Sequence, residues 1–405
     1  MKKVLVMRGR SKYNVLVEAT TQIAAGFEAR GYEVKIVDLE EKISLDEFSE
    51  LAEEMIKPYT FLFSCQALGF EIMLPEEMPL VRAIPNTYIG WIFDDVIYHM
   101  ERVENAYHDN TWLLTIDKEC GRAIQKMFPE VHHVNCLHHG GFCATITGEK
   151  KAEEEFWRDN RKDIGVLFPA NLGERVPFEW YVENTSKIEG FLAKNTVELL
   201  KKRPYLATRR ALELVLEGLG EELTGELLQE LKKMISVVDA YIRWQGRYDM
   251  LLALLKAGIR VTLIGDGEAY GQLAEEYPEQ LHFIGGADVL DVVKLMARSK
   301  IIMNPCSIYT EGLHERLCTA LLCKAVCFTP WSPYLESNFG NLFRYVNLDN
   351  LEEMTTEIQY ILEHPEVVEE QIEENYAYAM EYHTWKKRGE EIIDFYESQI
   401  APAQE

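Results

Sequence analysis

Short apolar runs alternate with amphipathic helical patterns along the first 150 residues of this chain. Predicted strands fall at residues 3–7, 32–39, 60–65, 88–93, 112–116 and 131–137. Between them, apolar side chains recur at helical spacing at residues 15–30, 45–56 and 118–128. Strands that alternate with helices indicate an α/β domain with a parallel, doubly wound sheet.

A second alternating set begins after a charged run at residues 149–163, which we predict to be the linker. Its predicted strands lie at residues 164–168, 260–264, 282–284, 300–303 and 325–329. A long stretch at residues 177–258 carries helical patterns and few strand signals. From residue 351 onward the chain is mainly helical and acidic. The pattern therefore predicts a second doubly wound sheet with a helix-rich insertion.

The overall charge narrows the range of partners. The 405 residues include 42 Lys and Arg against 67 Asp and Glu, a net charge of −25. A surface this acidic repels polyanions, so we expect no nucleic-acid partner and no attachment to an anionic membrane. No apolar run approaches the ~18 residues of a membrane span, and the first apolar run is interrupted by Arg8 and Arg10. The eight cysteines lack the spacing of a disulfide framework, so reduced thiols in a cytoplasmic protein are expected.

The segment at residues 304–330 carries the densest candidate chemistry. A polar loop leads from a predicted strand into a predicted helix at residues 315–323, followed by another strand. Five candidate residues stand at that junction: Glu311, Gly312, His314, Glu315 and Arg316. A helix N-terminus beside a parallel sheet attracts anions, and an arginine adds a planar fork of donors. We therefore predict a phosphate-binding site, the alternative being a capped surface helix with solvated charges.

Several motifs give the region from about residue 243 to 396 a family resemblance. In order, they are Arg247, VTLIGDGE at 261–268, LHFIGGAD at 281–288, GLHERLCTALLCKAVCFTP at 312–330 and HTWKKR at 383–388. This region resembles the glycosyltransferase-like domain of CgeB-type spore-maturation proteins, within the GT-B group of nucleotide-sugar glycosyltransferases. The N-terminal half is similar more loosely, through YIGWIFDD at 88–95 and LHHGG at 137–141.

The resemblance implies a GT-B architecture, with two Rossmann-like domains facing a cleft and a C-terminal helix crossing back. We expect an acceptor-side domain at residues 1–150, a nucleotide-sugar domain at 151–375 with a helical insertion at 177–245, and the returning helix at 376–405. The resemblance also implies a nucleotide-sugar donor, a protein or glycan acceptor, and no bound metal or further cofactor. It does not distinguish a UDP-, GDP- or dTDP-linked sugar.

One departure from the family pattern concerns the nucleotide. Many retaining GT-B enzymes carry E-x7-E here, the second glutamate accepting hydrogen bonds from the ribose. In this chain Glu311 occupies the first position, but Thr319 occupies the second and Lys324 replaces the glycine that usually follows. A threonine cannot accept the two hydrogen bonds that a carboxylate can. Either Glu315 performs that task, or the nucleotide is held differently, or it is not held at all.

Further candidates come from strand ends. The Gly265-Asp266-Gly267 turn could approach a base or ribose, or could be an ordinary turn. Asp94 and Asp95 end a predicted strand, where a carboxylate could activate an acceptor hydroxyl or cap a helix.

A His/Cys-rich segment spans residues 132–143. Alternate strand residues point to opposite faces and no C-x2-C pair exists, so we predict no metal site. We instead expect His138 or His139 to line the cleft between the domains.

Together these features predict a metal-independent glycosyltransferase. Arg316 and Arg247 would neutralise the diphosphate, Glu311 would touch the sugar, and Asp94, Asp95 or His139 would handle the acceptor. Two alternatives remain open. A sugar-nucleotide epimerase would turn over its substrate without an acceptor, and a catalytically inactive binding or structural protein would bind no nucleotide.

Overall fold

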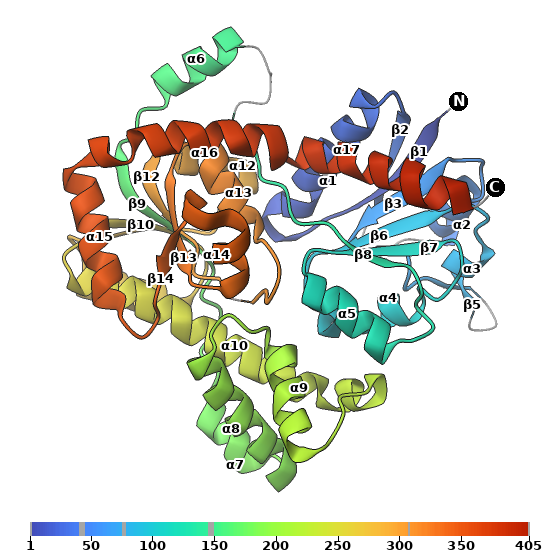
Figure 1. Ribbon diagram of the computed structural model, residues 1–405, viewed down its shortest axis with the longest axis horizontal. Helices are drawn as coiled ribbons and strands as arrows, with labels where there is room; N and C mark the ends of the chain where they lie inside the picture. The colour runs from blue at the N-terminus through green and yellow to red at the C-terminus, as the bar shows by residue number, and fades with distance from the viewer. Residues whose placement is uncertain (1, 40–44, 75–77, 145–149, 307, 404–405) are drawn as a thin grey trace. The chain divides into compact units, whose positions relative to one another are not determined.

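The computed structural model describes residues 2–39, 45–74, 78–144, 150–306 and 308–403, which form two units (Figure 1). The first unit comprises Met1–Gly140 together with His383–Glu405, and the second comprises Gly141–Tyr382. The chain leaves the first unit after residue 140, ten residues before the expected boundary at residue 150. It returns to the first unit at residue 383, seven residues after the expected start of the returning helix at residue 376. Within the described ranges, no helix is both long and apolar enough to cross a membrane.

The first unit is built on a six-stranded parallel sheet in the order β2-β1-β3-β6-β7-β8. Its strands are β1 (Lys3–Gly9), β2 (Glu33–Leu39), β3 (Phe61–Cys65), β6 (Tyr88–Ile92), β7 (Thr111–Thr115) and β8 (Val134–Cys136). All residues of β3 and β6 are buried, because helices cover both faces of a parallel sheet. The six predicted strands are confirmed. A two-residue pair, β4 (Met73–Leu74) with β5 (Met78–Pro79), was too short to carry a sequence signal.

In the described part of this unit, six α-helices accompany the sheet: α1 (Val15–Ala29), α2 (Leu45–Met55), α3 (Leu80–Ala83), α4 (Met100–Glu104), α5 (Lys118–Met127) and α17 (Trp385–Phe395). The last helix belongs to this unit because it crosses α1 at two glycines. A Cβ built on Gly26 would lie 2.2 Å from the carbonyl oxygen of Lys386, and one on Gly389 would lie 2.1 Å from that of Ile23. No side chain fits at this crossing, so both positions require glycine.

The HTWKKR motif anchors the start of α17 within the first unit. Thr384 caps the helix by accepting the Lys387 N–H at 3.0 Å. Arg388 is buried, donates through Nε to the His139 carbonyl at 3.1 Å, and lies 2.8 Å from Nδ1 of His383. Burial and then the Arg388 charge lower the pKa of His383 to about 3.

This contact predicts an acid-sensitive unfolding equilibrium. Because the pKa of His383 is lower in the folded chain than in the unfolded chain, its neutral form favours folding. That stability is complete above the ordinary histidine value and is lost as the pH falls from there toward about 3. The unfolding free energy of the wild type should fall as the pH is lowered from 6 to 4. In His383→Gln we expect the slope of this fall to be smaller, by up to about 1.4 kcal/mol per pH unit. Denaturant titrations across this range provide the measurement, with exposed His364→Gln as the control. Identical slopes for wild type and His383→Gln would contradict the assignment.

The second unit has a parallel sheet in the order β11-β10-β9-β12-β13-β14. Its strands are β9 (Ile164–Pro169), β10 (Val261–Ile264), β11 (Leu281–Gly285), β12 (Ser299–Met303), β13 (Val326–Pro330) and β14 (Arg344–Val346). The chain runs from β9 outward through β10 and β11, then returns to the other side of β9 for β12. The strand order therefore reverses between β9 and β12, which is where open α/β sheets bind ligands. The edge strand β14 was not predicted, since it has only three residues, two of them half-buried.

The helices of the second unit are α6 (Lys150–Asp159), α7 (Phe178–Asn184), α8 (Lys187–Lys202), α9 (Thr208–Leu219), α10 (Gly225–Lys256), α11 (Glu268–Glu276), α12 (Val289–Ala297), α13 (Glu315–Leu322), α14 (Pro333–Phe339), α15 (Leu351–Glu363) and α16 (Glu369–Tyr382). The charged run predicted as a linker forms α6 instead. Its Glu, Lys and Ala residues are strong helix formers, and this propensity was underestimated.

The insertion is continuous with the core of the second unit through α10. This helix has 32 residues, so the expected insertion boundary at residue 245 falls inside it. Its N-terminal half buries Leu228, Met234 and Ile235 on the side of α7, α8 and α9, which Figure 1 shows gathered beside it. Its C-terminal half buries Leu251 and Leu254 in the same hydrophobic core as strands β9 and β10. One helix thereby fixes the insertion to the sheet.

Candidate functional site

The candidate site lies in the second unit, where the loops after β9 and β12 leave the sheet. The loop after β12 leads into α13, whose N-cap is His314. The His314 Nδ1 accepts the backbone N–H of Arg316 at 3.0 Å. The His314 imidazole therefore caps the helix. The other backbone N–H groups of the first turn have no partner within the helix and point beyond its N-terminus.

Arg316 is fixed by a chain of hydrogen bonds that starts in the core. Its Nη1 donates to Oδ1 of Asn304 at 3.0 Å, and Nδ2 of Asn304 donates to Oγ1 of Thr329 at 3.0 Å. Asn304 and Thr329 are both buried. Asn304 was not predicted as a site residue, although its position directly after β12 was a usable signal. The guanidinium is thus pre-oriented at the carboxyl edge of the sheet.

Arg247 approaches the same region from α10. Its Nη1 donates to the Asn171 carbonyl at 2.5 Å, in the loop after β9. Its Nε is buried without a hydrogen-bond partner among the described residues. Burial, then the charge of Arg243, and further the charge of Arg316 lower the pKa of Arg247 to about 10. The hydrogen-bond partners of the two arginines, Asn171 after β9 and Asn304 after β12, follow neighbouring strands, so Arg247 and Arg316 approach the same edge of the sheet.

Neither Arg247 nor Arg316 forms an ion pair with a carboxylate in the part of the chain that the structure describes. Two guanidinium groups that converge without an ion-pair partner among the described residues favour an anion with several oxygens, such as a diphosphate.

Thr319 is not available to a ligand. Its side chain is completely buried, donates through Oγ1 to Glu315 Oε1 at 2.6 Å and accepts the Phe142 N–H at 3.0 Å. The neighbouring Gly141 lies so close that an added Cβ would be 2.5 Å from the Thr319 nitrogen. The segment after residue 140 therefore covers the position from which the family's second glutamate would reach the ribose. Burial raises the pKa of Glu315, whose carboxyl faces Thr319.

The backbone conformation at Lys324 is one that favours glycine, the residue that the family pattern has at this position. It follows α13 with φ +52°, in the left-handed region that glycine adopts without strain. Here the lysine is held by Glu373, at 2.7 and 2.9 Å, and by the rings of Tyr376 and Trp157.

The Gly265-Asp266-Gly267 turn packs against the loop after β9. A Cβ on Gly265 would lie 2.2 Å from the Ala170 carbonyl oxygen, and the Asp266 N–H donates to Oδ1 of Asn171 at 2.8 Å. The turn therefore supports the segment that also binds Arg247. The two glycines are required for this close approach.

Gly312 and Glu311 lie in the loop before α13, and this loop is tied to the insertion. Thr310 Oγ1 accepts the Ala207 N–H, between α8 and α9, at 2.9 Å. Gly312 is buried and lines a small cavity of about 20 Å³ with Tyr205 and His314. Glu311 is half-buried, and its contact with a sugar remains a prediction.

In the first unit, the predicted acceptor residues have separate environments. Asp95 caps a 3-10 turn at Val96–Tyr98, accepting the Ile97 N–H at 3.2 Å. The side chain of Asp94 is 41% exposed and accepts a hydrogen bond from Nε2 of Gln66 at 2.7 Å. His139 is buried, with ring centroids 4.7 Å from Phe93 and 5.4 Å from Trp385. Asp94 and Asp95 are both half-buried after β6, but the Asp95 carboxylate caps the 3-10 turn, and His139 is buried.

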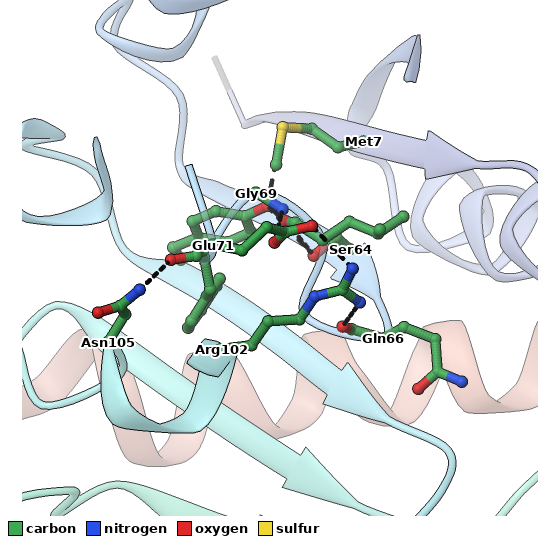
Figure 2. Close-up of polar contacts among 10 residues, drawn as sticks. Met7, Ser64, Gln66, Gly69, Glu71, Arg102 and Asn105 are labelled. Atoms are coloured by element: carbon green, nitrogen blue, oxygen red, sulfur yellow. Dashed lines mark hydrogen bonds and ion pairs between the residues drawn. The ribbon is translucent and has the colours of Figure 1, made fainter. Parts of the chain in front are cut away.

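A polar network that the sequence did not indicate holds the loop after β3 (Figure 2). Arg102 donates to the Gln66 carbonyl at 2.6 Å and to Glu71 Oε1 at 2.7 Å, while Glu71 Oε2 accepts the Gly69 N–H at 2.9 Å. Gln66 has φ +59°, a conformation that costs energy for a residue with a side chain. The network stabilises this strained residue, which in turn positions Asp94.

A larger cavity, of about 850 Å³, opens at the opposite edge of the second sheet. Residues at the starts of the strands line it, among them Lys162, Arg260 and Lys300. Ligands of open α/β sheets bind at the carboxyl ends of the strands, so this cavity is not the candidate site. Among the residues that the structure describes, no cluster of His, Cys, Asp or Glu is arranged to hold a metal ion.

Comparisons with known proteins agree with this geometry. Residues 247–394, from Arg247 into α17, match the family model described as glycosyl transferase-like. The chain has the GT-B fold, and its region 247–394 is similar to the glycosyl transferase-like family. No curated protein sequence matches.

Solved structures share the fold along the whole chain. Sucrose-phosphate synthase from Thermosynechococcus elongatus is 9% identical, with a TM-score of 0.56 and coverage of 99% of this chain and 100% of that one. HepE from Anabaena, solved with UDP-glucose, is 11% identical, with a TM-score of 0.56 and coverage of 98% and 100%. AviGT4, a glycosyltransferase of avilamycin A biosynthesis, is 10% identical, with a TM-score of 0.52 and coverage of 99% of both chains. The predicted GT-B architecture with Rossmann-like domains is confirmed.

Proposed function

We propose that this GT-B protein transfers a sugar from a nucleoside-diphosphate sugar to a protein or glycan acceptor. The observation that carries the proposal is the convergence of Arg247 and Arg316, without carboxylate partners among the described residues, on the reversal point of the second sheet. The glycosyl transferase-like match over residues 247–394 supports it. The CgeB-type resemblance of the same region is a finer proposal.

The two arginines would stabilise the negative charge that develops on the diphosphate leaving group. As the bond between the sugar and the diphosphate breaks, negative charge accumulates on the leaving group. Arg316, held by Asn304, and Arg247, held by Asn171, would face that charge with donors already in place. The first-turn amides of α13 add partial positive charge. These groups can supply the stabilisation that a metal ion gives in other transferases, so we propose a metal-independent reaction.

The remaining roles are assigned by position. Glu311, in the loop before α13, would contact the donor sugar, and Asp94 would act on the acceptor hydroxyl as a general base. Neither UDP, GDP nor dTDP is favoured by the geometry. HepE was solved with UDP-glucose, which makes UDP the first nucleotide to test.

A thermal-shift screen with UDP, GDP, CDP and dTDP in the presence of EDTA tests donor binding. We expect at least one of them to raise the melting temperature by a few degrees, because a ligand at 100 times its Kd adds about 2.7 kcal/mol to folding. No shift with any of the four would refute the proposal. It would favour a GT-B binding or structural protein, for which the burial of Thr319 is the supporting observation. Turnover of the sugar nucleotide to an isomer without an acceptor would instead indicate an epimerase.

A further inference from the structure

A second cavity opens at the carboxyl edge of the sheet in the second unit, beside the last two strands. It has a volume of about 450 Å³. Trp331 directly follows β13, Asp349 follows β14, and Tyr205 comes from the connection between α8 and α9. Tyr205 and Trp331 also line the small cavity at Gly312 and His314, so the two cavities are neighbours.

Aromatic side chains form one part of its lining. The indole Nε1 of Trp331 donates to Oε2 of Glu336 at 3.1 Å, and the Tyr205 ring meets the indole edge-on, with centroids 5.6 Å apart. Trp331 is nevertheless 38% exposed. A large aromatic surface is therefore held in a fixed orientation while remaining accessible to a ligand.

Polar groups with spare hydrogen-bonding capacity form another part. The hydroxyl of Tyr345 is buried and has no hydrogen-bond partner among the described residues. The exposed side chain of Asp349 makes no ion pair or hydrogen bond within those residues either. Glu353 accepts a hydrogen bond from Asn350 through one carboxylate oxygen, at 3.4 Å. The carboxylates of Asp349 and Glu353 therefore keep acceptor capacity for a ligand that brings its own hydrogen-bond donors.

The charge of the lining decides between classes of ligand. Asp349 and Glu353 contribute two carboxylates, and Glu357 adds a third that is 3.4 Å from Arg344. Among the lining residues that the structure describes, Lys202 is the one cation. Phosphate groups are repelled by such a surface, which separates this cavity from the arginine site.

We propose that this cavity binds a neutral saccharide. A sugar ring presents an apolar C–H surface to an aromatic ring, and its hydroxyl groups donate to carboxylates. The volume lies within the range of small-molecule sites. Binding at this cavity does not require the transfer reaction, so this proposal can be tested independently of the proposed function.

Saturation-transfer difference NMR on the full chain, with the methyl glycosides of glucose, galactose, mannose, N-acetylglucosamine and rhamnose, tests the proposal. We expect at least one glycoside to bind with a millimolar Kd, and Trp331→Ala to weaken it at least tenfold. Trp180→Ala is the matched control, because Trp180 is 62% exposed on α7 and does not line the cavity. It should leave the Kd unchanged. Glucose 1-phosphate should bind more weakly than methyl glucoside.

Three outcomes would overturn the assignment: no binding of any glycoside at 100 mM, equal weakening by both tryptophan variants, or tighter binding of glucose 1-phosphate. Circular dichroism of each variant verifies the fold. Asp349→Asn gives an independent test at an exposed position, where folding is not at risk and weaker binding is again expected. The nucleoside-diphosphate shift should persist in Asp349→Asn, whose side chain does not line the cavity at Gly312 and His314, so that failure here and failure of the donor site give different results.

Discussion

Replacing Arg316 by alanine should abolish the melting-temperature increase caused by nucleoside diphosphates and lower kcat/KM for transfer by about 10²–10³-fold. The reason is the fixed geometry of the guanidinium, which Asn304 orients from the core at 3.0 Å. Loss of a pre-oriented donor removes stabilisation of the developing charge, and water in its place must reorganise. Arg247 would remain, but a single guanidinium cannot span both phosphates. Thermal shifts and initial rates with the nucleotide identified in the screen provide the measurement.

Two further variants distinguish a specific role of the Arg316 guanidinium from the loss of a positive charge and from a nonspecific effect on the fold. Arg316→Lys keeps the positive charge but loses the planar fork, so an intermediate loss is expected. Arg298→Ala is the matched control, since Arg298 is paired with Asp163 and lies at the start of β12, at the opposite edge of the sheet. It should retain the full nucleotide shift. A nucleotide shift that survives in Arg316→Ala would place the diphosphate elsewhere.

The fold was largely accessible from the sequence because parallel strands buried on both faces leave strong apolar runs. The runs at β3 and β6 are buried throughout, and both were predicted within one residue. The failures occurred where this signal is weak. The edge strand β14 has three residues, and β4 and β5 have two each. The charged run at α6 was mistaken for a linker, since an exposed helix and a polar connection have similar compositions.

The candidate site was only partly accessible, because its geometry depends on contacts between distant segments. The Arg316 junction followed from a strand, a loop and a helix in sequence order. The pairing of Asn304 with Thr329 and of Arg247 with Asn171 links positions 25 and 76 residues apart, and no local pattern encodes such contacts. The position of Thr319 is equally non-local, because its hydroxyl accepts from Phe142, 177 residues earlier. Only the structure shows that this position is filled by the chain itself.

The largest expected effect on stability comes from Gly389→Ala, where α17 crosses α1. The added methyl group would lie 2.1 Å from the Ile23 carbonyl oxygen and 3.0 Å from the Gly26 Cα, both backbone atoms of a buried helix. Neither atom can move without displacing the helix, so we expect a loss of about 3 kcal/mol in unfolding free energy. Denaturant titration followed by circular dichroism measures the loss. Hydrogen exchange should rise in α1 and α17 together, because each helix covers the other.

Gly246→Ala on α10 is the matched control for this substitution. Gly246 is also helical, but an added Cβ there meets no atom within 4 Å. The same chemical change should therefore stabilise the protein by about 0.5–1 kcal/mol, through the higher helix propensity of alanine. Opposite signs for the two variants would attribute the Gly389 effect to the helix crossing alone. If Gly389→Ala instead matched the control, the close contact between α1 and α17, and with it the anchoring of the C-terminal helix to the first unit, would be refuted.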